Sequence, residues 1–390
     1  MREGEIIVIE TKEMVALQEF YETNQLDEEW IFLGRQAIYA PGLTARGGQI
    51  TELSVNGRIT NLEPLTALTA LQELEMEHGV ISDLGLLAKL TNLTRLGLHS
   101  NHVRDLSPLA GLKRLTSLGL DGNWIEDLGP LANLTALTSL CLTGNVISEL
   151  TPLKNLAGLT WLGLDNNRLA DLEPLAHLVN LESLQLENSA LIDLAPLVRL
   201  PRLSALRLGE NPGLDLYPLS RMSSLTELLL CEAEVSDLQP LAGLFKLEEL
   251  WLEDNLISDL GPLANLTALT KLVLDENKIS DLSPLADLTA LTSLSLSKNE
   301  IRDLAPLAGL SRLASLNLRD NDLSELAPLD GLTALRDLDL SHNRITDLEP
   351  LSRLTSLTSL TVAGNKLRRF HDRKLIPQKS GYEPITIYEK

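Results

Sequence analysis

The sequence predicts an α/β solenoid, a curved right-handed stack with a parallel sheet on its concave face, short helical or 3-10 turns on its convex face, and a cap at each end. Three observations predict this fold. From residue 71 to residue 370 the chain repeats every 22 residues without an insertion or deletion. Each repeat places an L-x-L pair in one half and a D-L-x-P-L motif in the other. Aromatic residues make up only 3% of the chain and hydrophobic residues 44%, so aliphatic side chains must fill the interior.

One turn position fixes the register of the repeats. It falls at residue 79 and then at every 22nd residue up to residue 365, which makes 14 strict units, and asparagine fills 11 of them. The exceptions are Gly79, Ser189 and Ala233. A looser unit precedes the strict ones around Ile50 and Ile59. Repeats of this kind stack on one continuous core, so the chain's length does not by itself indicate several globular domains.

Each repeat is expected to contribute one short strand, from Arg95 to His99 in the second strict unit. The alternation of side chains along a strand sends Leu96 and Leu98 inward and Arg95, Gly97 and His99 outward. Strands from successive repeats then pair side by side in one parallel sheet.

The turn after the strand is expected to hold neighbouring repeats together. Asn101 is predicted to be buried there, with its amide bonded to backbone groups that the bend leaves unpaired. Asp105 is expected to cap a short helical turn that Pro108 starts, and 13 of the 18 prolines occupy this position. Because extended chain and helical turn differ in width, the stack should bend with its strands on the concave face.

The ends of the stack need covers, since a terminal repeat would otherwise expose its leucines. We predict an N-terminal helical cap over residues 1–49, a solenoid of about 15 repeats over residues 50–369, and a C-terminal cap over residues 370–390. Thr11 is a candidate helix N-cap. The apolar residues that follow it at helical spacing are Met14, Leu17, Phe20 and Tyr21.

Two further segments are predicted at the ends of the solenoid. The segment from Trp30 to Gly57 should form short strands that lead into the loose first repeat. The segment from Pro384 to Tyr388 should form a last strand. No separate second domain is predicted.

The balance of charge limits the classes of partner. The formal net charge is −21, which repels phosphate backbones and anionic lipid, so we expect neither nucleic-acid nor membrane binding. No targeting sequence and no membrane-spanning stretch is found. Cys141 and Cys231 lie about four repeats apart, too far for a disulfide, and free thiols favour a reducing compartment. We therefore expect a cytoplasmic monomer.

The consensus L-x-x-L-x-x-L-x-L-x-x-N-x-I-x-D-L-x-P-L-a-x, as in Leu90 to Gly111, resembles the leucine-rich repeats of bacterial internalins. It is also similar to the 22-residue repeats of a protein phosphatase 1 regulatory subunit. The segment from Ala16 to Trp30, followed by GGQITELSVNG, looks like the helical cap that precedes many extracellular leucine-rich repeats. The resemblance implies a bacterial source and a solenoid whose concave face grips protein partners.

Three internalin features are not found in this sequence. Secreted internalins carry a signal peptide, an immunoglobulin-like segment after the repeats and a surface anchor. The resemblance therefore gives little support to a role in host-cell invasion, and it transfers no catalytic residue to this chain.

Bulky residues occupy the outward-facing strand positions of the central repeats. Trp161, Trp251, Arg207 and Leu229 stand where no core requires them, and Trp and Arg are the residue types that dominate binding energies at interfaces. We predict a partner-binding stripe on the concave face. Its residues are Trp161, Gln185, Glu187, Arg207, Glu227, Leu229, Glu249, Trp251, Glu253, Lys271 and Asp275.

The repeats near this stripe also depart from the consensus. Ser189 and Ala233 replace the turn asparagine, and Asn211-Pro212-Gly213 alters the turn between them. Two interpretations stay open: these repeats are adapted to a ligand, or a robust array has drifted.

An acidic run follows the same strands near the concave rim, formed by Glu210, Glu232, Glu234, Asp254 and Glu276. Charge at a rim mainly sets the rate of encounter and the choice of partner, which favours a partner with a basic patch. Solubility is the alternative explanation of the same charges.

Three histidines fall in adjacent repeats, namely His78, His99 and His102. Glu77 and Asp121 occupy the same repeat position as His99 in the repeats before and after it. Imidazole and carboxylate groups could therefore approach within about 5 Å. No ligand spacing requires a metal, and we expect ordinary exposed histidines, with no metal and no cofactor.

The sequence favours a non-enzymatic protein-binding module. No nucleophile elbow, phosphate loop or Ser/His/Asp arrangement is found, and a smooth open sheet offers no pocket that excludes water. Two alternatives stay open beside it: an internalin-like surface adhesin or virulence factor, and a regulatory subunit of a phosphatase or other enzyme.

Overall fold

The computed structural model describes residues 11–26, 32–33, 36–37, 43–367 and 386–388. The chain forms two compact units, Met1–Arg202 and Leu203–Lys390.

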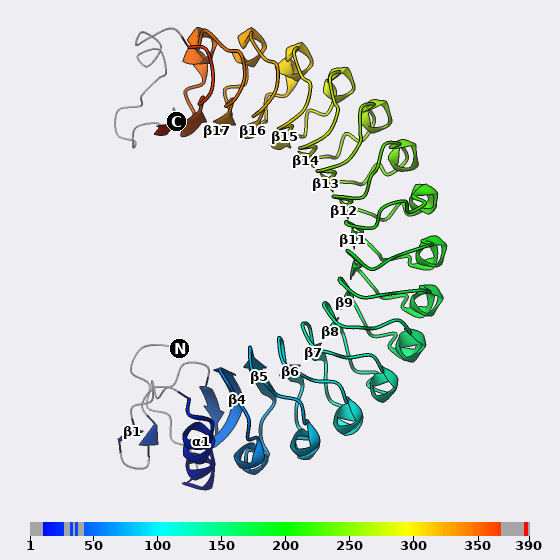
Figure 1. Cartoon of the computed structure of the whole chain (residues 1–390), viewed down its shortest axis with the longest axis vertical. Helices are drawn as coiled ribbons and strands as arrows, with labels where there is room; N and C mark the ends of the chain where they lie inside the picture. The colour runs from blue at the N-terminus through cyan, green and yellow to red at the C-terminus, as the bar shows by residue number, and fades with distance from the viewer. Residues whose placement is uncertain (1–10, 27–31, 34–35, 38–42, 368–385, 389–390) are drawn as a thin grey trace. The chain divides into compact units, whose positions relative to one another are not determined.

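Unit 1 begins with a helix and continues as a stack of strands and 3-10 turns (Figure 1). The helix is α1 (Thr11–Asn24). The strands are β1 (Phe32–Leu33), β2 (Gln36–Ala37), β3 (Leu43–Arg46), β4 (Gln49–Asn56), β5 (Glu73–Glu77), β6 (Arg95–Gly97), β7 (Ser117–Gly119), β8 (Ser139–Cys141), β9 (Trp161–Gly163) and β10 (Ser183–Gln185). The 3-10 turns are η1 (Glu63–Ala67), η2 (Gly85–Lys89), η3 (Ser107–Gly111), η4 (Gly129–Leu131), η5 (Thr151–Asn155), η6 (Glu173–His177) and η7 (Ala195–Arg199).

Unit 2 continues the same alternation. Its strands are β11 (Ala205–Arg207), β12 (Glu227–Leu229), β13 (Glu249–Trp251), β14 (Lys271–Val273), β15 (Ser293–Ser295), β16 (Ser315–Asn317), β17 (Asp337–Asp339), β18 (Ser359–Thr361) and β19 (Thr386–Tyr388). Its 3-10 turns are η8 (Tyr217–Arg221), η9 (Gln239–Leu241), η10 (Gly261–Leu263), η11 (Ser283–Leu285), η12 (Ala305–Gly309), η13 (Ala327–Leu329) and η14 (Glu349–Arg353).

The strands of each unit pair in chain order. In unit 1, β3 and β4 are antiparallel, and β4 to β10 pair in parallel with a register of one repeat. In unit 2, β11 to β19 pair in parallel. Within each unit the strands line the inner side of the stack and the 3-10 turns its outer side (Figure 1). The predicted placement of sheet and turns is confirmed.

Leucine fills most of the interior because each repeat presents it at most inward positions, with isoleucine or valine at others. Leu96 and Leu98 are both buried, as the strand alternation predicts. Leu109 from the 3-10 turn meets them from the opposite side and is fully buried. Burial of a leucine side chain contributes about 1.5–3 kcal/mol, and each repeat buries several, so the core comes from many similar contacts rather than one centre.

In most repeats a buried asparagine joins the repeat to the one before it, as predicted. The side-chain amide of Asn123 donates to the backbone oxygens of Leu98 at 2.9 Å and Leu120 at 3.0 Å. Its side-chain oxygen accepts from the backbone N–H of Val103 at 2.9 Å. Asn101, at the predicted position, makes the same bonds one repeat earlier. The amide thus satisfies donors and acceptors that the turn cannot pair internally.

Two local predictions need correction. The strand predicted from Arg95 to His99 ends at Gly97, because the pairing continues beyond it only as separate backbone bonds such as Leu98 N–H to Gly119 O at 2.8 Å. The residue at the N-cap of η3 is Leu106, whose side chain makes no capping bond. Asp105 stands one position earlier and accepts from the N–H of Ser107 at 2.8 Å, so it closes the turn into η3 without being its N-cap.

The helix α1 covers the start of the unit 1 stack. Its predicted apolar residues Met14, Leu17, Phe20 and Tyr21 are all buried. Asn24 at its end accepts from the backbone N–H groups of Thr60 at 2.7 Å and Asn61 at 2.8 Å. Glu13, fully buried, accepts from the N–H of Ile50 at 2.5 Å. The helix is therefore bonded to the first repeat as well as packed on it.

At the other end, β19 pairs in parallel with β18, which confirms a last strand, although it starts at Thr386 rather than Pro384. The preceding part of the predicted C-terminal cap lies outside the described residues. In the described part of the chain, no helix is both long enough and apolar enough to span a bilayer.

Candidate functional site

Three side chains form an apolar strip on the sheet face of unit 2. Leu229, Trp251 and Val273 stand in register on β12, β13 and β14. Each is half-buried, whereas the flanking Leu228, Leu250 and their equivalents are fully buried in the core. Most other repeats carry a polar or small residue at this position, so the strip is the part of the face where apolar surface meets solvent.

A cation covers the tryptophan of the apolar strip. The Lys271 ammonium lies 4.5 Å from the centroid of the Trp251 ring. Lys271 also stands in register with Glu249 on β13. Such a contact at a partly exposed site contributes about 0.5–1 kcal/mol.

The remaining predicted residues of unit 2 surround the apolar strip with charge. Arg207 and Glu227 form an ion pair at 3.5 Å in which both side chains keep solvent access, so it adds little stability. Glu253 is exposed. The Asp275 carboxylate is hydrogen-bonded within unit 2. It accepts from Ser295 Oγ and from the N–H of Ser297, both at 2.7 Å.

The other three residues of the predicted stripe belong to unit 1. Trp161, Gln185 and Glu187 are half-buried on its sheet face, so the two predicted tryptophans both point out of the core. The structure thus divides the stripe between the two units, and one continuous contact surface across them stays a prediction.

The acidic run of unit 2 lies at a turn position whose backbone is left-handed in every strict repeat, including those with Lys298 and His342. Glu210, Glu232, Asp254 and Glu276 occupy one position in four successive repeats, and each has a positive φ between 52° and 55°. This left-handed conformation costs a residue with a side chain roughly 1 kcal/mol, and glycine or asparagine fills the position in several repeats of unit 1. Glu234, two residues after Glu232, also has a positive φ. All five side chains are exposed.

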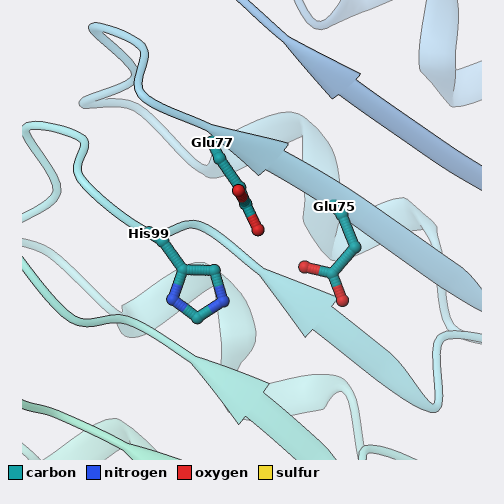
Figure 2. Close-up of side chains that lie close together, drawn as sticks. All are labelled: Glu75, Glu77 and His99. Atoms are coloured by element: carbon teal, nitrogen blue, oxygen red, sulfur yellow. The ribbon is translucent and has the colours of Figure 1, made fainter. Parts of the chain in front are cut away.

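A cluster of three titratable residues lies on the sheet face of unit 1. Glu75 and Glu77 from β5 and His99, which follows β6, bring one donor atom each within 4.8 Å of one another (Figure 2). We call this the Glu–His cluster. His99 Nδ1 hydrogen-bonds Asp121 in the next repeat. His78 and His102, the other two histidines of the sequence prediction, are exposed and do not join it.

The environment of the Glu–His cluster shifts three pKa values. Burial raises the pKa of Glu75, and the His99 charge opposes this shift only in part. The hydrogen bond to Asp121 raises the pKa of His99 despite its partial burial. Burial alone would raise the pKa of Asp121, but the hydrogen bond and charge of His99 hold it below its usual value. The pair therefore stabilises the protonated form of His99 and the ionised form of Asp121 relative to the same side chains apart.

The sequence did not single out Trp124, which is 53% exposed. The Arg104 guanidinium lies 4.9 Å from its ring centroid, and the His102 ring packs edge-on against it. With Ser82 and Asp105 these residues line a surface pocket of about 380 Å³. Trp124 follows a turn asparagine, where strand alternation no longer distinguishes inward from outward side chains. Its only signal in the sequence is a large aromatic at a position that varies from charged to apolar among the repeats.

Both cysteines carry thiols rather than a disulfide, as predicted. Burial raises the pKa of the Cys141 thiol to about 11, which keeps it protonated at neutral pH. A group this far from ionisation is a poor nucleophile.

The comparisons with known proteins agree with this architecture. Models of the leucine-rich repeat match residues 113–155, 245–287 and 333–372 as two-copy repeats, and a second leucine-rich repeat model matches residues 267–323. No curated protein matches the sequence.

Three solved structures show the range of similar proteins. An internalin (inlF) from Listeria monocytogenes is 36% identical over 77% of this chain and 89% of that chain, with a TM-score of 0.70. A leucine-rich repeat protein of Leptospira interrogans is 25% identical over 86% of this chain and 89% of that chain, with a TM-score of 0.76. A plant peptide hormone receptor, RGFR1 in complex with RGF2, shares the fold at 20% identity, 84% and 52% coverage and a TM-score of 0.56.

The repeat consensus, the strand and 3-10 alternation in both units and the identity to the Listeria protein lead to one assignment. The chain belongs to the leucine-rich repeat family and is internalin-like.

Proposed function

We propose that this chain is a non-enzymatic module that binds a partner protein on the sheet face of unit 2, with the apolar strip at the centre of the contact. The observation that carries the proposal is the strip itself: Leu229, Trp251 and Val273 side by side and half-exposed on adjacent strands. Leucine-rich repeat proteins commonly bind other proteins, and they use the extended face that stacked strands create.

The chemistry of the strip suits a protein interface. A large aromatic ring surrounded by polar residues is typical of an energetic hot spot, because the rim excludes water from the centre. Glu227, Glu249 and Glu253 provide such a rim around Trp251. The cation over the ring is supplied by Lys271, so the ring is held in place before any partner arrives.

The charge of the module favours a partner with a basic patch. Glu210, Glu232 and Asp254 keep exposed carboxylates at a backbone position that glycine or asparagine would occupy with less strain. Their exposed negative charge fits a role in steering a basic partner to the face.

The identity to a Listeria internalin favours a second candidate function, that of an internalin-like surface adhesin. A regulatory subunit that grips an enzyme is the same binding activity with a different partner. The identity of the partner separates these roles: a host surface protein indicates the adhesin, and an enzyme of the same cell indicates the regulator.

Affinity capture with matched variants tests the proposed surface. Full-length protein, Trp251→Ala and Phe245→Ala would each be used to capture proteins from the organism that carries the gene. Phe245 is an exposed aromatic that follows η9 and lies outside the strands, so its variant controls for the loss of any exposed ring. We expect a protein retained by the wild type and Phe245→Ala and lost with Trp251→Ala. Equal capture by all three would refute the proposed surface.

A further inference from the structure

We propose that the Glu–His cluster of unit 1 binds a divalent transition-metal ion, with Glu75, Glu77 and His99 as ligands and Asp121 as the residue that positions His99. This site is separate from the proposed protein-binding surface, since all its residues belong to unit 1 and the apolar strip belongs to unit 2.

The spacing of the donor atoms fits a single ion. Zn²⁺ takes imidazole nitrogen at about 2.0–2.1 Å and carboxylate oxygen at about 2.0–2.2 Å, so its ligands stand roughly 3.3 Å apart. The three donors of the Glu–His cluster lie within 4.8 Å of one another. Rotation about the side-chain bonds of Glu75 and Glu77 would close this difference without moving the strands.

A buried oxygen supplies an observation independent of this spacing. Oε2 of Glu75 is shielded from solvent and accepts no hydrogen bond from the described residues. A carboxylate oxygen without a partner is expensive to bury, and nearly all such atoms in proteins are hydrogen-bonded or coordinate a cation. The charged groups that act on Glu75 are His99 and Glu77 of the cluster, together with Arg95 and Glu73.

The bond from His99 to Asp121 gives the imidazole the orientation of a metal ligand. Because Nδ1 is bonded to Asp121, Nε2 is the nitrogen left for an ion, which must displace any proton on Nε2 when it binds. Figure 2 shows one ring nitrogen of His99 on the side of Glu75 and the other on the far side. Metal-binding histidines usually donate their second N–H to a carboxylate in this way, which fixes both tautomer and ring position.

Two glycines make room for the cluster. A Cβ atom at Gly97 would overlap the Glu75 carboxylate, and a Cβ atom at Gly119 would overlap the His99 ring. Glycine weakens a strand interior, and it often marks a place where something must approach the backbone closely. These strand glycines let both ligand side chains lie against the sheet beside each other.

The donor set selects the class of ion. Ca²⁺ and Mg²⁺ prefer six or more oxygen ligands and take imidazole poorly, whereas one nitrogen and two carboxylates suit Zn²⁺ and its neighbours in the first transition series. Three protein ligands leave a coordination position for water, as in open zinc sites.

Calorimetric titration of the full chain tests the site. The protein would carry no polyhistidine tag, be stripped with chelator, and be titrated with Zn²⁺ and, separately, with Mg²⁺. We expect saturable binding of one Zn²⁺ per chain and none of Mg²⁺. His99→Ala should weaken Zn²⁺ binding at least tenfold. His102→Ala, which removes an exposed histidine of the same repeat outside the cluster, should leave the affinity unchanged.

Two further variants separate coordination from folding. Asp121→Asn should weaken Zn²⁺ binding by about 10–100-fold while the circular dichroism spectrum stays that of the wild type. Co²⁺ bound to the wild type should give visible ligand-field bands that Glu75→Gln diminishes. Saturable Zn²⁺ binding that survives in His99→Ala, or no saturable binding in the wild type, would overturn the assignment.

Discussion

Single buried asparagines set the bonding between successive repeats. In unit 2, Asn277 donates to the backbone oxygens of Leu252 and Leu274 and accepts from the N–H of Ile257 at 2.9 Å. Ser189, in the same position of unit 1, offers a hydroxyl that reaches the backbone oxygens of Leu164 and Glu187 at 3.1 Å and 3.0 Å. A hydroxyl has one proton to donate, whereas an amide has two. Serine therefore keeps this turn position buried but can donate fewer hydrogen bonds than asparagine.

Asn277→Ala is expected to lower the free energy of unfolding by about 2–3 kcal/mol. The substitution removes the amide and leaves the N–H of Ile257 and the oxygen of Leu252 buried without this partner. Urea unfolding followed by circular dichroism measures the loss. Lys278→Ala, at the adjacent exposed residue, should change stability by less than about 0.5 kcal/mol. Equal effects of the two variants would contradict the role of the asparagine.

Cys141 is expected to react slowly with iodoacetamide in the folded protein. Its pKa is raised to about 11 from 9.0, so below both values the folded state holds roughly a hundredfold less thiolate than the unfolded chain. Because the folded pKa is the higher one, the difference persists through neutral pH and fades only as pH rises toward 11. The rate would be measured in Cys231→Ser at pH 8 with and without urea. A native rate within a few-fold of the urea rate would refute the raised pKa.

Residue-level chemistry was only partly predictable from the sequence. The repeat pattern predicted that His99 lies beside Asp121, because the two residues occupy the same position in adjacent repeats. It did not predict the contact between His99 and Glu75, because Glu75 occupies a different position of its repeat and reaches His99 diagonally over Gly97. That contact depends on the rotamer of Glu75, and a repeat pattern carries no information about rotamers.

At the scale of the element, the 22-residue period predicted the order and placement of the strands, the 3-10 turns and the buried asparagines. A 22-residue unit with fixed leucines has one way to bury them, so strands, 3-10 turns and the asparagine ladder follow from one consensus. The errors lie at element ends. The strand at Arg95 is shorter than predicted, and Leu106 rather than Asp105 is the N-cap residue, because bonding at a terminus depends on geometry that the pattern does not specify.

Asn24→Ala is expected to loosen α1 from the first repeat. The side chain holds the backbone of Thr60 and Asn61 through three bonds of 2.7–2.9 Å, so its loss should cost about 2–3 kcal/mol of cap stability. Amide exchange in α1 and β4 should accelerate while β8 stays protected. Glu19→Ala, at an exposed position of the same helix, should leave exchange in β4 unchanged. Unaltered exchange in Asn24→Ala would show that packing alone holds the cap.

For the whole molecule, we propose that charge steers a basic partner toward the chain and that the apolar strip sets the strength of the complex. The net charge of −21 acts at long range, while the acidic run of unit 2 concentrates carboxylates beside the sheet face. The sequence predicted this distribution of charge. The repeat period gave no signal for the division of the chain near residue 202, since the units on either side share the same consensus.

The combined substitutions Glu210→Asn, Glu232→Asn and Asp254→Asn are expected to slow association with a basic partner. Asparagine accepts the left-handed backbone better, so the fold should be as stable as the wild type or slightly more so. Stopped-flow association rates at low and high salt measure the effect. The wild-type rate should fall as salt rises, and the triple variant should respond less. A wild-type rate that is indifferent to salt would leave solubility as the explanation of the acidic run.

The most direct test of the central claim is the dissociation constant for the captured partner, measured by calorimetry with the wild type, Trp251→Ala and Phe245→Ala. We expect Trp251→Ala to weaken binding at least tenfold, about 1.4 kcal/mol or more, and Phe245→Ala to stay within about twofold of the wild type. A Trp251→Ala variant that binds as tightly as the wild type would contradict it.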